Sequence, residues 1–169
     1  MARFKINVVI WYILLLGWMG FIFIMSAQTS QESSNVSGGI VSKLIAVFYN
    51  KFDLLSDEAQ AEITEIFTVI VRKSAHFLEY FVLGVFSLLS AVSYNKYSFK
   101  ITAIYAAVVC VLYSISDEIH QFFVPGRACR FMDICIDSAG SITAILLLSF
   151  LFYKKRKKSG ETNAKKEID

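Results

Sequence analysis

The stretch INVVIWYILLLGWMGFIFIM, residues 6–25, contains no charged side chain, and it decides the class of fold. A bilayer with a hydrocarbon core about 30 Å thick is crossed by roughly 20 helical residues. Arg3 and Lys5 precede the stretch, as in a secretory signal peptide. The stretch is longer than a typical signal, however, and bulky Met25 stands where cleavage requires a small residue. We therefore predict a first membrane helix that is retained.

Three further apolar stretches follow, at residues 76–94, 99–116 and 131–153. Hydrophobic residues make up 56% of the chain and Pro occurs once, which is the composition of membrane helices and not of a soluble domain. Each stretch is close to the length that crosses a bilayer. We expect an all-α polytopic membrane domain over residues 1–158, with four transmembrane helices, followed by a polar tail over residues 159–169.

Basic residues predict the orientation of these helices. Lys96 and Lys100 lie between the second and third stretches, and the cluster KKRKK at residues 154–158 follows the fourth. Because Lys and Arg concentrate in cytoplasmic loops, we expect both termini in the cytoplasm. A basic cluster directly after a membrane helix is typical of a cytoplasmic helix end, so it does not indicate nucleic-acid binding.

The loop after the first membrane helix is long and changes character along its length. Residues 26–34 are polar without apolar periodicity, which predicts an irregular connector. Apolar residues recur at helical spacing over 40–48, after Gly38 and Gly39, and again over 55–70. We expect two amphipathic helices on the membrane surface or over the bundle, the second continuing through Arg72 into the second membrane helix. Ordinary packing of a solubilised segment is the alternative.

Polar side chains recur on one face of three membrane helices, near the ends that would face outward. The second helix carries Lys73, His76, Tyr80, Gly84 and Ser87, with Glu79 beside them. The third, if it continues past Ser116, carries Tyr113, Asp117, His120 and Gln121, with Glu118 pointing elsewhere. The fourth carries Asp133, Asp137, Gly140 and Ala144, whose last two small residues permit close helix packing. Ionisable groups in membrane helices turn inward and pair, so we expect the three faces to converge.

A turn is predicted between the third and fourth helices. In Val124-Pro125-Gly126-Arg127, the Pro-Gly pair suits the middle of a type II turn. Such a turn would aim Arg127 at the polar cluster. Arg72, Lys73, Arg127 and Arg130 would all lie outside, against the usual charge rule, which makes them candidates for an anionic partner.

Four groups of residues carry a resemblance to a known family. They are Lys73-x-x-His76-x-x-x-Tyr80, Asp117-Glu118-x-His120-Gln121, Pro125-Gly126-Arg127, and Asp133 followed by Gly140. In order and spacing they resemble the VanZ family, bacterial membrane proteins linked to reduced teicoplanin susceptibility. Asp137 departs from the family pattern, which has Asn there, and adds a carboxylate to the cluster. The resemblance implies a multi-pass protein of the bacterial cell membrane that acts on or around an anionic cell-wall precursor, a lipid or a glycopeptide.

One hypothesis for the chemistry is an enzyme acting on an anionic lipid or lipid-linked phosphate. Cationic side chains would hold its phosphate or carboxylate oxygens. His120 with Asp117, or His76 with Glu79, would provide an oriented base or nucleophile. The catalytic candidates are His120, Asp117, His76 and Glu118. The ligand-binding candidates are Lys73, Arg127, Tyr80, Gln121, Asp133 and Asp137.

Two other interpretations stay open. The protein could be a binder that shields an anionic precursor or the antibiotic itself, or the cluster could be a buried ion network that only specifies helix packing. Zinc-helix, serine-elbow and lipid-phosphatase motifs are absent from the sequence, and two His with scattered carboxylates form no metal signature. We therefore expect no cofactor or resident metal. Cys110, Cys129 and Cys135 have neither CxxC spacing nor an even count, so we expect packing residues and no disulfide.

Overall fold

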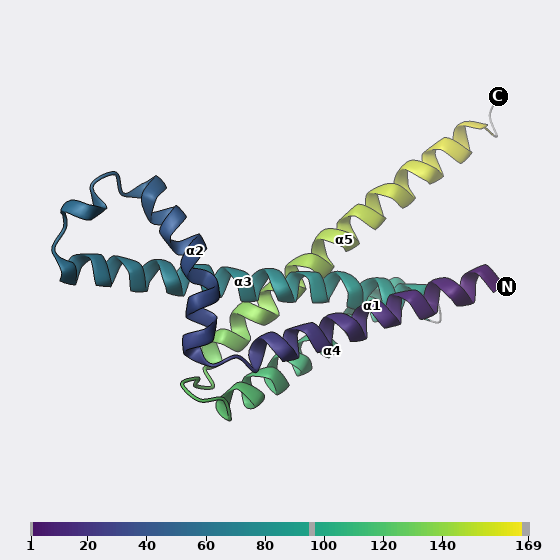
Figure 1. Ribbon diagram of the computed structural model, residues 1–169. Helices are drawn as coiled ribbons and strands as arrows, with labels where there is room; N and C mark the ends of the chain where they lie inside the picture. The colour runs from purple at the N-terminus through teal and green to yellow at the C-terminus, as the bar shows by residue number, and fades with distance from the viewer. Residues whose placement is uncertain (1, 95–96, 167–169) are drawn as a thin grey trace.

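The computed structural model describes the backbone of residues 2–94 and 97–166 and the side chains of residues 8–94 and 97–154. Among these residues every regular element is a helix, and short turns and loops join the helices (Figure 1). The elements are α1 (Ala2–Ser26), α2 (Ser30–Phe48), the 3₁₀ turn η1 (Phe52–Leu54), α3 (Asp57–Tyr94), α4 (Phe99–Phe122) and α5 (Phe131–Lys166). Four of them, α1, α3, α4 and α5, are long and apolar enough to cross a membrane. The predicted all-α fold with four membrane helices is confirmed.

The four long helices run alternately up and down one bundle (Figure 1). The start of α1 and the end of α5 therefore lie on the same side of the molecule. At the opposite side, α1 and α4 end and α5 begins, while α2, η1 and the first half of α3 extend from the bundle as an arm. We call that side the pocket end, because the cavity described below lies there.

Close contact between α3 and α5 depends on two glycines. A Cβ atom at Gly84 would collide with the backbone carbonyl of Ser141, and one at Gly140 would collide with that of Phe77. Ala144 is fully buried one turn further along α5. The small residues on the fourth helix thus bring the two backbones together, as their spacing predicts.

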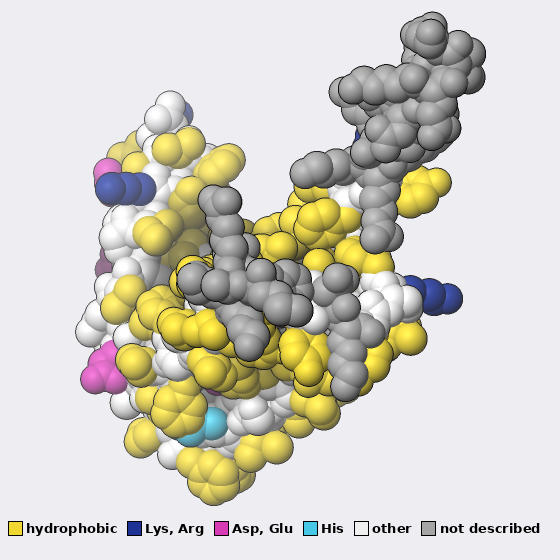
Figure 2. Space-filling model, turned by 90° about the vertical axis from the view of Figure 1, so that its right-hand side faces the viewer, with side chains coloured by type: hydrophobic (Ala, Val, Ile, Leu, Met, Phe, Trp, Pro, Cys, Tyr) yellow, Lys and Arg dark blue, Asp and Glu magenta, His cyan; other side chains and the backbone are white. Residues whose placement is uncertain are grey.

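The bundle exposes many large apolar side chains on its surface. Leu15, Leu83 and Leu88 belong to the buried core, whereas Leu16, Leu112 and Leu146 each have more than 60% of their surface exposed. Seen from the side that holds the start of α1, hydrophobic side chains cover most of the visible bundle (Figure 2). Contiguous apolar surface of this extent is expected where helices contact lipid and not water.

The predicted irregular connector over residues 26–34 is wrong from Ser30 onward, because α2 begins there. Thr29 is its N-cap: Glu32 N donates to Thr29 Oγ1 at 3.3 Å, and Thr29 N donates to Glu32 Oε2 at 2.8 Å. This reciprocal capping box, Thr-x-x-Glu, was present in the sequence and outweighs the polar composition of the segment. The helix also runs through Gly38 and Gly39 without a break.

Three of the helices are longer than the apolar stretches that they contain. As predicted, α3 continues through Arg72 into the membrane stretch, while α4 extends past Ser116 to Phe122 and α5 continues beyond residue 153 to Lys166. Lys96 and the side chains of the basic cluster at 155–158 lie outside the described residues. The packing interpretation holds for Cys110, which is buried, but it is wrong for Cys129 and Cys135, which are exposed; all three thiols are free.

Candidate functional site

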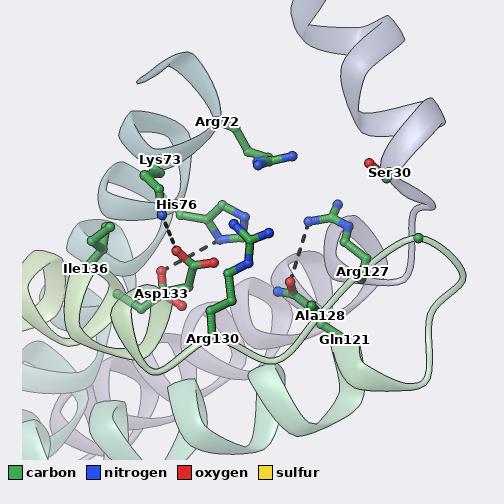
Figure 3. A pocket seen from close by; sticks show the side chains of 12 residues that line it. Ser30, Arg72, Lys73, His76, Gln121, Arg127, Ala128, Arg130, Asp133 and Ile136 are labelled. Atoms are coloured by element: carbon green, nitrogen blue, oxygen red, sulfur yellow. Dashed lines mark hydrogen bonds and ion pairs between the residues drawn. The ribbon is translucent and has the colours of Figure 1, made fainter. Parts of the chain in front are cut away.

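A cavity of about 470 Å³ opens at the pocket end, between α3, the start of α5 and the loop that joins α4 to α5. We call it the cationic pocket. Its charged lining residues are Arg72, Lys73, Arg127, Arg130, Asp133 and Asp137. Figure 3 shows the side chains of Arg72, Arg127 and Arg130 reaching into the same space from α3 and from the loop. The polar faces of the second and fourth helices do converge here.

One ion pair joins the two helices that wall the pocket. Lys73 Nζ on α3 contacts Asp133 Oδ1 in the first turn of α5. The side chain of Lys73 is 32% exposed and that of Asp133 is 27% exposed. A partly solvated pair of this kind contributes little to stability, but it neutralises one cation and one carboxylate of the pocket.

Arg127 is held in the pocket by neutral acceptors. Arg127 N donates to Val124 O at 3.1 Å and Gly126 has φ +76°, so the predicted type II turn is confirmed. Arg127 Nε donates to the carbonyl of Gln28 at 3.2 Å, and Nη1 donates to Gln121 Oε1 at 3.5 Å. Within the described part of the chain, no carboxylate lies within ion-pair distance of this guanidinium.

The pKa of Arg127 is shifted in the direction expected for a guanidinium without a paired carboxylate. Partial burial, and then the positive charge of Arg72, lower the pKa of the Arg127 guanidinium. Arginine nevertheless stays protonated in proteins, so its charge persists. The pocket therefore contains a partly desolvated cation beside a second cation, an arrangement that an anionic ligand would relieve.

Asp117 supports Arg127 through Gln121. Gln121 accepts from Arg127 and donates through Nε2 to Asp117 Oδ2 at 3.0 Å. The same Asp117 oxygen accepts from Ser26 Oγ of α1 at 2.9 Å. Asp117 is buried and does not line the pocket, so it acts by fixing Gln121 and the end of α1. The suggested partners Lys73 and His120 do not reach it.

His76 lies in the pocket wall opposite a buried carboxylate. Its Nδ1 is 3.7 Å from Asp137 Oδ1, which is within ion-pair distance but too long for a hydrogen bond. Asp137 is fully buried, and neither of its oxygens has a hydrogen-bond partner among the described residues. The suggested pairing of His76 with Glu79 is wrong, because Asp137 is the carboxylate that faces the imidazole.

His120 and Glu118 do not line the pocket. The His120 ring stacks on Phe23 of α1, with ring centroids 4.2 Å apart. The suggested His120–Asp117 pair is wrong, since α1 receives the two side chains separately through Phe23 and Ser26. Glu118 is fully buried, and its Oε2 accepts from the backbone N of Arg130 at 2.9 Å, so it holds the loop before α5.

Tyr80 also lies away from the pocket. It is fully buried one turn beyond His76, with its ring 6.3 Å from that of Tyr113 and its hydroxyl without a hydrogen-bond partner among the described groups. The described residues contain no cluster of three His, Cys, Asp or Glu side chains that could hold a metal ion. Besides its arginines and the paired Lys73 and Asp133, the pocket presents the imidazole of His76 and the carboxylate of Asp137.

The family model VanZ/LLP1 matches residues 11–153. The chain belongs to the VanZ/LLP1 family. The match includes most or all of each candidate membrane span and every residue that lines the cationic pocket. No curated protein and no solved structure matches the chain. Family and helices together make this a multi-pass membrane protein.

The predicted site residues of this VanZ/LLP1 protein do not include every residue that lines the pocket. Arg72 lines it and lies four residues before His76, so helical spacing alone puts it on the same face. Ser30, in the first turn of α2, also lines the pocket. The capping box that starts α2 was the one signal that could have located it.

Proposed function

We propose that this VanZ/LLP1 protein acts at the outer face of the bacterial cell membrane, on or around an anionic cell-wall precursor, a lipid or a glycopeptide, and lowers teicoplanin susceptibility. The observation that carries the proposal is the charge of the cationic pocket. Four cations line it against two carboxylates, and Lys73 and Asp133 neutralise each other. The planar guanidinium of Arg127 suits a bidentate contact with phosphate or carboxylate.

The proposed orientation follows from the opposite side of the bundle. Lys100, at the start of α4, and Lys154, in the later part of α5, lie there. Arg3 and Lys5 belong to the start of α1, which lies on the same side. By the charge rule that side is cytoplasmic, which places both termini inside and the pocket outside. In a cysteine-free background, an impermeant thiol reagent added to intact cells should label Gln31→Cys and spare Ser98→Cys. The reverse pattern would remove the outer-face proposal.

The test of function separates ligand contact from folding. Arg127→Lys keeps the charge but loses the planar fork, and Asp117→Asn weakens the anchor of Gln121. Both variants should accumulate in the membrane at near-normal levels and yet lose most of the teicoplanin phenotype. Lys100→Gln, an exposed cation at the other end, is the control and should behave as wild type. If the phenotype falls only in step with the amount of folded protein, the cluster is a packing network.

A second candidate function is hydrolysis of a lipid-linked phosphate, and the position of His76 favours it. His76 lies in the pocket wall with Asp137 on its Nδ1 side. Its Nε2 would take a proton from water as the water oxygen attacks phosphorus and the P–O bond to the lipid breaks. The cations would stabilise the leaving oxygen until the imidazolium returns that proton to it, giving phosphate and the lipid alcohol. Purified protein should then release phosphate or lipid alcohol, and His76→Gln should bind without turnover. Binding without release in the wild type would indicate a non-catalytic binder.

A further inference from the structure

A second, smaller cavity adjoins the cationic pocket. It has a volume of about 130 Å³ and lies between the end of α1, α2 and α3; we call it the α2–α3 groove. The two cavities share three lining residues, Arg72, His76 and Arg127. An occupant of the groove would therefore be in contact with the same cations that line the pocket.

Most of the exposed lining surface of the groove is apolar. Met25, Val36, Ile40, Val71 and Ala75 provide its hydrophobic surface. The hydroxyl of Ser37 donates to Ser33 O at 3.1 Å within α2, and that of Ser26 donates to Asp117. These lining hydroxyls already have partners inside the protein. Glu79 also lines the groove and disfavours a second anion there, while the apolar side chains suit a hydrocarbon chain.

The groove is too small to be a ligand site of its own, so we treat it as an extension of the pocket. Ligand sites usually measure roughly 300–1,000 Å³, a range that includes the pocket at about 470 Å³ but not the groove at about 130 Å³. The groove also opens outward, because Val36 and Ile40 line it and still have 64% and 55% of their surface exposed. A chain entering it can therefore come from the apolar surroundings of the bundle.

We infer that the ligand of the cationic pocket is an anionic lipid, whose phosphate lies among Arg72, Arg127 and Arg130 while the first part of its hydrocarbon chain lies in the α2–α3 groove. This inference rests on the proposed function and names its substrate class. A small water-soluble anion would use the pocket and leave the apolar groove unfilled. An anionic lipid matches both the charge of one cavity and the adjoining apolar surface of the other.

The test compares two soluble phosphates that differ only in chain length. Purified protein in a non-ionic detergent is titrated with ethyl phosphate and with hexyl phosphate. Hexyl phosphate should bind at least about tenfold more tightly, since burying two methylene groups in an apolar site is sufficient for that difference. Arg127→Ala should weaken both ligands. Equal affinities in the wild type, both dependent on Arg127, would overturn the lipid inference and leave the proposed anion site standing.

A matched pair of substitutions on α2 locates the chain. Val36→Trp fills the groove, whereas Val47→Trp places the same ring on the same helix at a residue that is 75% exposed and lines neither cavity. Val36→Trp should remove the advantage of hexyl over ethyl phosphate and leave ethyl phosphate unchanged, and Val47→Trp should change neither. Retention of the hexyl advantage in folded Val36→Trp would overturn the groove assignment. If Val36→Trp does not fold, the wild-type comparison decides, and failure of both phosphates to bind would overturn the proposed anion site as well.

Discussion

Helices α3 and α5 meet in two different ways along their shared length. Around Gly84 and Gly140 their backbones touch, and the adjoining side chains, Leu83 and Ala144 among them, are buried. Toward the pocket end the same helices face each other through Lys73 with Asp133 and His76 with Asp137, and a cavity remains between them. The tight part fixes the distance between the two helices, while the open part leaves a charged cavity between them.

The largest effect is expected in the tight part. In Gly140→Ala the added methyl would collide with the carbonyl of Phe77, so the helices must separate. We expect a loss of about 1–3 kcal/mol in stability, the usual cost of overpacking, seen as a lower melting temperature in detergent and less protein in the membrane.

The control is Gly17→Ala, since nothing lies within 4 Å of a Cβ atom at that position of α1. It should leave both measurements nearly unchanged. Similar melting temperatures for Gly140→Ala and the wild type would show that the α3–α5 contact is not tight.

Substitutions in the open part should change the affinity for phosphate more than they change the stability of the protein. Asp133→Asn frees Lys73 and adds one positive charge to the pocket, whereas Lys73→Gln removes one. In a partly exposed site a unit charge is worth about 1 kcal/mol, so phosphate affinity should rise roughly fivefold in the first variant and fall roughly fivefold in the second.

Stability in both variants should change by only about 0.2–1 kcal/mol, as for other partly exposed pairs. The two quantities are measured by phosphate titration and thermal melting of the same preparations. Parallel losses of stability and affinity in both variants would mean that the Lys73–Asp133 pair serves packing, and the contrast between the two parts of the interface would fail.

The smallest effect concerns the start of α2, which borders both cavities. The backbone N–H of Thr29, and then its hydroxyl, lower the pKa of Glu32 below its ordinary value. A carboxyl whose pKa is lowered on folding stabilises the helix above its ordinary pKa, and this contribution is lost as the pH falls through the lowered value. Amide protection in the first turn of α2, corrected for intrinsic exchange, should therefore decrease below about pH 4.

Glu32→Gln is the matched control, since Gln can keep the reciprocal capping bonds without titrating. Its amide protection should be independent of pH over that range. A decrease of equal size in the variant would assign the effect to another group.

Several features of the fold were predictable because they depend on local physics. The length of each apolar stretch requires a membrane helix, and Pro125-Gly126 favours one turn type regardless of its surroundings. Helical spacing also placed Lys73 and His76 on the face that meets α5. The start of α2 was missed, although a local signal, the capping box of Thr29 and Glu32, was available.

Periodicity and backbone preference act within one element, so the order of residues alone sets the number of membrane helices, the turn before Arg127 and the faces on which polar residues gather. The partners of those residues depend on the folded bundle: His76 faces Asp137 and not Glu79, His120 stacks on Phe23, and Glu118 holds the backbone of Arg130. Spacing gives the face of a helix, but the rotation and depth at which two helices meet depend on all of their packed side chains together. A carboxylate one turn away on the same helix can therefore be a worse partner than one that is 61 positions distant in the sequence.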